Sequence, residues 1–211
     1  QVLVNLLHES GVPESALIHL PGLGETVGDA LVKHERVASI VFTGSKAVGM
    51  SIINQISQKS IYNRLRKLTV PKSVVAEMGG KNAVIVTANA ELDETVDGIL
   101  YSAFGHSGQK CSAASRIIVD LDIKDKLLER LKEACSDLRV GVAFDMSSYM
   151  NPIISEEDKI RLQKAVQEAS KEAINFNGKV ILDRSQENLP GQCLGPTLID
   201  LPAERAIKQD S

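Results

Sequence analysis

Short runs of apolar residues alternate along the chain with stretches in which apolar residues recur every three or four positions. A short apolar run is typical of a strand buried in a sheet, whereas the three-and-four spacing places side chains on one face of a helix. Strands that alternate with helices favour parallel sheets. The sequence therefore predicts an α/β fold with open, mostly parallel sheets and flanking helices. The runs predicted as strands are residues 16–20, 38–42, 73–76, 83–86, 116–119 and 179–182.

The stretches between these runs are predicted as helices from their apolar spacing. Ser45 stands where the run at 38–42 passes into a helix, and serine is a residue type that caps a first turn. Ser155 and Asp158 have the spacing of a capping box at the start of another helix. Residues 58–72 carry several basic side chains and are predicted as an exposed connector. The predicted helices lie around residues 2–7, 25–33, 45–56, 92–103, 123–138 and 155–173.

Length and charge narrow the classes of function. A chain of 211 residues allows one large domain or two smaller ones. Its 24 Lys and Arg against 27 Asp and Glu give a net charge of -3, so no basic field would attract nucleic acid or an anionic membrane. No apolar run approaches the roughly 20 residues of a membrane span, and we expect no transmembrane segment. Three cysteines, an odd number, do not make a disulfide framework, so we expect a reducing, cytoplasmic environment.

The first candidate for chemistry is Thr43-Gly44-Ser45, where a strand passes into a helix. Free backbone N–H groups and the helix dipole favour a phosphate at such a point, and glycine allows a ligand to approach. Simple capping by Ser45 is the alternative, because the three-glycine dinucleotide fingerprint is not complete. Pro21-Gly22-Leu23-Gly24 is a weaker candidate, since a Pro-Gly turn needs no function.

The second candidate is Glu77, which ends an apolar strand and precedes Met78-Gly79-Gly80. A carboxylate near apolar surroundings has a raised pKa and can act as a general base near neutral pH. An ordinary charged residue in a surface turn is the alternative.

The third candidate is Cys111, in the glycine-containing segment Ser107-Gly108-Gln109-Lys110-Cys111. The Lys110 cation would favour the nucleophilic thiolate, and backbone N–H groups beside the cysteine could hold an oxyanion. Cys135 shares a helix with several leucines and, like Cys193, is predicted to be a small buried apolar residue. His106 is interpreted as structural, because no third group is evident that would orient it as a base.

Taken together, Thr43-Gly44-Ser45, then Glu77-Met78-Gly79-Gly80-Lys81-Asn82, then Gly108-Gln109-Lys110-Cys111 resemble the aldehyde dehydrogenase superfamily. The 34 residues from Glu77 to Cys111 match the interval in that family between the catalytic acid and the nucleophile. The run at 102–116 resembles the branch that oxidises L-glutamate γ-semialdehyde, the open form of 1-pyrroline-5-carboxylate, to L-glutamate in proline catabolism.

The resemblance implies catalytic roles for two residues and a substrate contact for a third. Cys111 would be the nucleophile that attacks the aldehyde, and the resulting thiohemiacetal would lose a hydride to NAD and leave a thioester. Glu77 would activate the water that hydrolyses this thioester. Ser112 would contact the substrate carboxylate.

The same resemblance implies an NAD site and no metal site. Gly44 and Ser45 would contact the pyrophosphate of NAD, and Gly22 and Gly24 would belong to the wall on the adenine side. Met78 and Gly79 would neighbour the nicotinamide ring. The preference between NAD and NADP stays open at this point.

The resemblance covers the middle of the family's chain. Residues 1–76 would be the C-terminal half of an NAD-binding domain and residues 77–211 the N-terminal part of a catalytic domain. The chain begins in a helix without an initiator Met and ends in a polar run at 204–211, so we expect a piece of a longer protein that is inactive alone.

The family also implies partners and a location for the intact enzyme. It would be a homo-oligomer acting on a small aldehyde, in the cytoplasm or, in a eukaryote, the mitochondrial matrix. A fusion to a proline dehydrogenase domain is one form in which this activity occurs. Two alternatives remain: another NAD(P)-dependent aldehyde dehydrogenase, and a catalytically silent homologue that serves as a binding domain.

Overall fold

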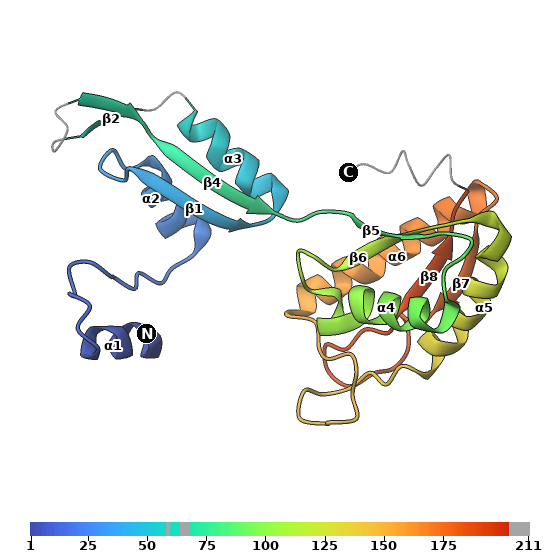
Figure 1. The fold of residues 1–211 in the computed structure, drawn as a ribbon. Helices are drawn as coiled ribbons and strands as arrows, with labels where there is room; N and C mark the ends of the chain where they lie inside the picture. Colours follow the sequence, from blue (N-terminus) through green and yellow to red (C-terminus); the bar gives the residue numbers. More distant parts are fainter. Residues whose placement is uncertain (58–59, 64–67, 203–211) are drawn as a thin grey trace. The chain divides into compact units, whose positions relative to one another are not determined.

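A computed structural model describes residues 1–57, 60–63 and 68–202 (Figure 1). The chain divides into two compact units, Gln1–Gly79 and Gly80–Ser211, and each is described by itself. The polar run at 204–211 lies outside the described residues. The domain boundary expected after residue 76 stays a prediction.

The first unit is built on a parallel pair of strands. Strand β1 (Ser39–Gly44) pairs with β4 (Ser73–Met78) in a register that runs from Ser39 opposite Ser73 to Gly44 opposite Met78. Helix α3 (Lys46–Ile56) follows β1 directly, and Ser45 caps it. Both the predicted passage from strand to helix and the predicted cap are therefore confirmed. The remaining elements of this unit are α1 (Val2–Glu9), a π-helical turn η1 (Gly24–Gly28), α2 (Asp29–Lys33), β2 (Ser60–Asn63) and β3 (Leu68–Pro71).

Helices cover one face of the β1–β4 pair. Every second residue of each strand points to this face, as the two-residue period of a strand requires. Gly49 allows α3 to approach closely, since a Cβ atom there would lie 2.6 Å from the sulfur of Met78. On the opposite face Val41 and Val75 are 78% and 53% exposed. The core beneath the helices consists of Val32, Ile52 and Ile56, packed against Ile40, Phe42 and Val74.

Two predictions for this unit are wrong. Residues 16–20 form no strand, and Ile18 and Leu20 are largely exposed. A strand needs a neighbour for its backbone N–H and C=O groups, and within the described residues none lies beside this run. The segment predicted as a connector at 58–72 instead contains β2 and β3, which pair antiparallel.

The second unit contains a parallel pair and an antiparallel pair of strands. Strand β5 (Asn82–Val86) pairs parallel with β6 (Ala114–Val119), and β7 (Lys179–Asp183) pairs antiparallel with β8 (Thr197–Asp200). The helices are α4 (Leu92–Phe104), the 3-10 turn η2 (Gly105–Gly108), α5 (Leu121–Asp137) and α6 (Glu156–Asn175). The predicted α/β class with helix-flanked parallel sheets is confirmed, whereas the apolar pattern does not predict β8.

Apolar stripes of α4 and α5 meet β5 and β6 to form the main core of this unit. Ile99, Leu127 and Leu131 are almost completely buried. Ser155 accepts a hydrogen bond from the backbone N–H of Asp158 at 3.1 Å, which confirms the predicted cap of α6. The full set of buried residues in this core is Val86, Val96, Ile99, Leu127 and Leu131.

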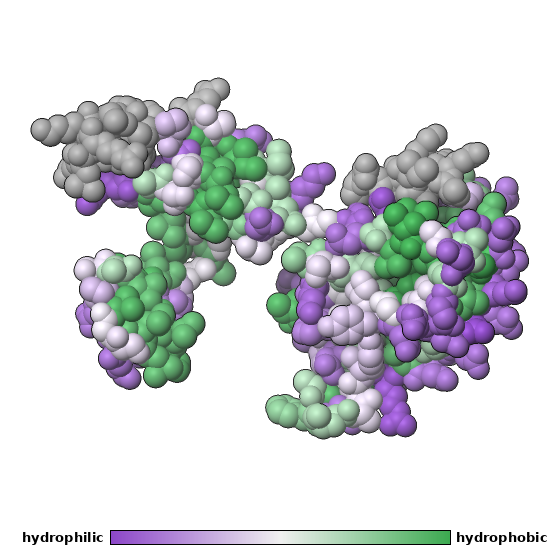
Figure 2. All heavy atoms as spheres, viewed as in Figure 1, coloured by the Kyte–Doolittle hydropathy of each residue, from purple (hydrophilic) through white to green (hydrophobic). Residues whose placement is uncertain are grey.

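Apolar side chains also reach the surface. Val2, Leu3 and Leu6 of helix α1 are each more than half exposed. Figure 2 shows green, apolar surface on the part of the molecule that contains this helix. In the described part of the chain, no helix combines the length and the apolar character needed to cross a bilayer.

Candidate active site

The carboxyl end of the β1–β4 pair brings two of the predicted motifs together. Thr43 lies opposite Glu77, and Gly44 lies opposite Met78. Ser45 follows at the start of α3, and Gly79 follows the end of β4. Carboxyl ends of parallel strands are where open α/β sheets bind ligands.

The start of α3 has the features of an anion site. Ser45 accepts a hydrogen bond from the N–H of Val48 at 3.3 Å, so the capping expected as an alternative is present. This cap uses one of the four N–H groups that a helix leaves without an internal partner. Gly44, Ser45 and Lys46 are exposed. A phosphate group fits a helix start with accessible N–H groups and a positive dipole.

Gly22 and Gly24 lie on a different segment, at the entrance to the turn η1. A Cβ atom at Gly22 would come within 2.2 Å of a methyl group of Val27, so packing favours glycine here. At Gly24 a Cβ atom would meet no atom within 4 Å. The geometry explains Gly22 without a ligand and leaves the surface above Gly24 open.

The two predicted catalytic residues belong to different units. Glu77 is the penultimate residue of β4 and is exposed on the face of the sheet opposite the helices. Cys111 and Ser112 lie in the second unit, on the loop between η2 and β6, and both are exposed.

The loop that leads to Cys111 has an unusual backbone. His106, Ser107 and Gly108 have φ angles of 53°, 56° and 70°, three consecutive residues in the left-handed region. This conformation is costly for residues other than glycine and persists only where surrounding contacts enforce it. A Cβ atom at Gly108 would lie 3.0 Å from the carbonyl oxygen of Ala103, so this position also favours glycine.

Two side chains of this loop hold it against the segment at 151–154. The Ser107 hydroxyl donates to the carbonyl of Asn151 and accepts from its N–H, both at 2.7 Å. The Gln109 amide donates to the carbonyl of Pro152 at 3.2 Å and accepts from the N–H of Ile154 at 2.9 Å. The partners are more than 40 residues away in sequence, which explains why the sequence carried no signal for them.

A third side chain, that of Asn82, also binds this loop. The Asn82 amide nitrogen lies 2.7 Å from the carbonyl oxygen of Cys111 and 3.2 Å from that of Ala113. The sequence indicates Asn82 only as the last residue of a motif. Ser107 and Gln109 thus tether the segment before Cys111, and Asn82 binds the carbonyls of Cys111 and Ala113.

The other two cysteines differ from Cys111 in burial. Cys135 and Cys193 are 0% and 1% exposed, which confirms their prediction as buried apolar residues. Burial raises the pKa of Cys135 to about 11, against the opposing effect of Arg184. Burial also raises the pKa of Cys193, with Lys159 opposing it. A thiol that keeps its proton is a poor nucleophile, so Cys111 is the accessible candidate among the three.

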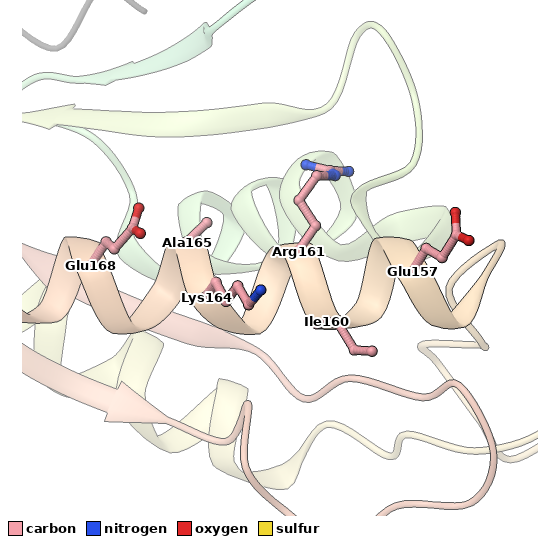
Figure 3. A pocket seen from close by; sticks show the side chains of 6 residues that line it. All are labelled: Glu157, Ile160, Arg161, Lys164, Ala165 and Glu168. Carbon is pink, nitrogen blue, oxygen red and sulfur yellow. The ribbon is translucent and has the colours of Figure 1, made fainter.

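A shallow hollow on α6 does not include any predicted site residue. Figure 3 shows its six lining side chains projecting from one helix. The described residues contain no cluster of side chains suited to a metal ion. The hollow is lined by Glu157, Ile160, Arg161, Lys164, Ala165 and Glu168.

The model of the aldehyde dehydrogenase family matches residues 1–210. The chain belongs to this family. Among relatives, 1-pyrroline-5-carboxylate dehydrogenase 1 of Halalkalibacterium halodurans is 35% identical over 98% of this chain and 38% of its own length. The 1-pyrroline-5-carboxylate dehydrogenase of Bacillus subtilis is 36% identical over 92% of this chain and 36% of its own length. The chain therefore spans less than two fifths of these aldehyde dehydrogenases.

Solved structures of the family have the same fold. A Thermus 1-pyrroline-5-carboxylate dehydrogenase with bound NAD superimposes with a TM-score of 0.84 at 32% identity, covering 100% of this chain and 39% of that one. Proline utilization A from Bdellovibrio bacteriovorus gives a TM-score of 0.83 at 39% identity, covering 95% of this chain and 20% of that one. The aldehyde dehydrogenase fold expected from the three motifs is confirmed.

Proposed function

We propose that this chain is the central part of an NAD-dependent aldehyde dehydrogenase that oxidises L-glutamate γ-semialdehyde to L-glutamate in proline catabolism. The observation that carries the proposal is the exposed Cys111 on a loop held at both sides, in a chain whose other two thiols are buried. The relatives named 1-pyrroline-5-carboxylate dehydrogenase support the substrate.

In this proposal the Cys111 thiolate forms a bond to the aldehyde carbon and gives a thiohemiacetal. NAD, when bound, supplies the acceptor for the hydride that leaves this carbon. The N–H of Cys111 makes no hydrogen bond within the described residues, so it is available to the oxygen on which negative charge develops. Loss of the hydride leaves a thioester on Cys111.

Glu77 completes the cycle by taking a proton from water. The oxygen of that water forms a bond to the acyl carbon, and the bond from carbon to sulfur breaks. The acid that forms and the protonated Glu77 each release a proton to solvent, which leaves the carboxylate of L-glutamate and the regenerated Cys111 thiolate. A positioned general base contributes about 10² to 10⁴ in rate.

All of the proposed NAD contacts come from residues of the first unit. The pyrophosphate would lie at Gly44 and Ser45, where the start of α3 favours negative charge. Met78 and Gly79 would neighbour the nicotinamide, and Gly22 and Gly24 the adenine side. Ser112 would donate to the carboxylate of the substrate.

We further propose that residues 1–76 complete an NAD-binding domain and residues 77–211 begin a catalytic domain, within a homo-oligomer. The chain alone would be inactive, because it spans less than two fifths of the length of these relatives. A proline dehydrogenase domain in the same polypeptide is proposed from the likeness to proline utilization A. A cytoplasmic location stays a prediction.

The test uses the full-length parent chain with L-glutamate γ-semialdehyde and NAD, and measures NADH formation. Cys111→Ala should abolish oxidation and leave NAD affinity unchanged, because the nucleophile holds no cofactor atom. Cys193→Ala is the matched control and should retain activity. Normal turnover by Cys111→Ala would refute the proposal.

The substrate is tested by comparing the semialdehyde with an uncharged aliphatic aldehyde of similar length. A site built around a carboxylate leaves polar groups unpaired when the carboxylate is missing, and such sites reject the analogue strongly. Equal kcat/KM values would assign the chain to another aldehyde dehydrogenase.

A further inference from the structure

The ladder between β5 and β6 is irregular at its first residue. Asn82 lies opposite Ala114, but Ala83 already lies opposite Arg116, so the register shifts between Asn82 and Ala83. Residues before Ala114 lie beyond this ladder. The backbone of β5 therefore supplies no donor to their carbonyl groups in this ladder.

The side chain of Asn82 supplies these donors. A primary amide carries two N–H bonds on one nitrogen, and here that nitrogen lies 2.7 Å from the oxygen of Cys111 and 3.2 Å from the oxygen of Ala113. Both neighbours are carbonyl acceptors, so the amide nitrogen must face them. One side chain therefore continues the pairing of β5 by two further hydrogen bonds.

These bonds determine the direction of the peptide groups around Cys111. In a trans peptide the C=O and the following N–H point in opposite directions. Asn82 fixes the carbonyl of Cys111, and the N–H of Ala113 fixes the carbonyl of Lys110 at 3.1 Å. Because the peptide group on each side of Cys111 is held, the N–H of Cys111 and the origin of its side chain have a set direction.

We propose that Asn82 is a positioning residue for Cys111. By holding the carbonyls of Cys111 and Ala113, its amide fixes two of the peptide groups that follow Cys111 and supports the turn in which the N–H of Ala113 holds the carbonyl of Lys110. The peptide of that Lys110 carbonyl carries the N–H of Cys111, which is thereby directed to meet the oxygen of a carbonyl compound that adds to the thiolate of the same residue. A role for this positioning in catalysis rests on the proposed function. The positioning itself involves only residues of the second unit.

The test compares two reactions of Cys111 in the 211-residue chain. In acylation by p-nitrophenyl acetate, the sulfur bonds to the acetyl carbon, a tetrahedral oxyanion forms, and p-nitrophenolate leaves. Alkylation by iodoacetamide displaces iodide and forms no oxyanion. Both need the thiolate, so the ratio of the two rates at Cys111 reports the oxyanion donor and cancels changes in thiolate fraction. Subtracting the rate of Cys111→Ala removes acylation at other groups.

Two variants and a matched control decide the proposal. Asn82→Ala removes the amide, and Asn82→Asp keeps its shape but donates no hydrogen bond at neutral pH. We expect the ratio of acylation to alkylation to fall about tenfold or more in both, since misplacing a reacting group by about 1 Å can cost 10²-fold. Asn89→Ala, an exposed asparagine of the same unit, should leave the ratio unchanged within about twofold.

Several results would overturn the proposal. An unchanged ratio of acylation to alkylation in both Asn82 variants would overturn it. A ratio that falls in Asn82→Ala but not in Asn82→Asp would also overturn it, because side-chain volume and not the N–H donors would then be responsible. Labelling of the buried Cys135 and Cys193 in either variant would assign Asn82 to folding instead. No step of this test uses NAD or the semialdehyde, so failure of the proposed function would leave its outcome readable.

Discussion

Thr43 lies directly opposite Glu77 across the parallel strands β1 and β4. The pairing places the glycine-serine turn after β1 beside the strand end that carries the proposed general base. Two motifs that are separate in the sequence thus become neighbours at one edge of a sheet. Within the described residues, the core beneath the helices lies on the other face of this pair, so a substitution at Glu77 tests the proposed site without disturbing that core.

In the full-length enzyme, Glu77→Gln should slow hydrolysis of the thioester more than its formation. Removal of a positioned base lowers the rate of the step that it assists by about 10² to 10⁴. The measurement is a pre-steady-state burst of NADH, which should remain while the following turnover becomes slow. Glu14→Gln, at an exposed position, is the control and should change neither phase. A lost burst would place Glu77 in the acylation step.

The three cysteines should differ sharply toward iodoacetamide in the folded chain. Cys111 is exposed, whereas Cys135 and Cys193 can react only after local opening. We expect Cys111 to be alkylated at least about 100-fold faster than either, and all three to react in denaturant. Mass spectrometry of the digested protein gives the site of labelling. Comparable native-state rates would contradict the burial of Cys135 and Cys193.

Burial of Cys135 should make stability depend on pH in the alkaline range. Its pKa is raised from 9.0 to about 11 by burial, opposed by Arg184, so the unfolded chain loses this proton first as pH rises. The stabilising contribution is complete below pH 9 and is lost as pH approaches 11. Two pKa units correspond to about 3 kcal/mol.

This pH dependence is measured as the difference in free energy of unfolding between the native chain and Cys135→Ala. The difference cancels groups that titrate in both proteins. We expect it to shift against the native chain by about 2 to 3 kcal/mol between pH 8.5 and 11. Parallel curves over this range would show that Cys135 ionises equally in the folded and unfolded chains.

Arg184 should stabilise the C-terminal end of α5. Its guanidinium donates to the carbonyls of Cys135 and Leu138 at 2.9 Å and of Ser136 at 3.1 Å. The last carbonyls of a helix have no internal partner, and hydrogen bonds from charged groups contribute about 1.5 to 3 kcal/mol. Arg184→Gln should lower the free energy of unfolding by about that amount in urea titrations.

Arg161→Gln is the matched control. Each arginine pairs with an acidic side chain three residues away at 2.7 Å, but the side chain of Arg161 is 67% exposed and that of Arg184 is 15% exposed. Exposed ion pairs contribute little, so this control should lie within about 0.5 kcal/mol of the native chain. Equal losses in both variants would assign the effect of Arg184 to its ion pair with Glu187.

The sequence by itself determined the fold class, the family and the identity of the accessible thiol. Local periodicity is sufficient for helices such as α4 and α5, whose apolar stripes reflect the face they bury. Ser45 and Ser155 were identified as caps because a cap is a contact between residues three apart. The burial of Cys135 also followed from local spacing, since it shares the stripe of its helix.

Tertiary structure alone decided which distant groups hold the Cys111 loop. Ser107 and Gln109 bind residues 151–154, and Asn82 binds a carbonyl 29 positions away. Hydrogen bonds between segments far apart in sequence depend on how strands and helices assemble, and no local pattern encodes them. The same reason explains the error at residues 16–20: an apolar run becomes a strand only when another strand supplies its hydrogen bonds.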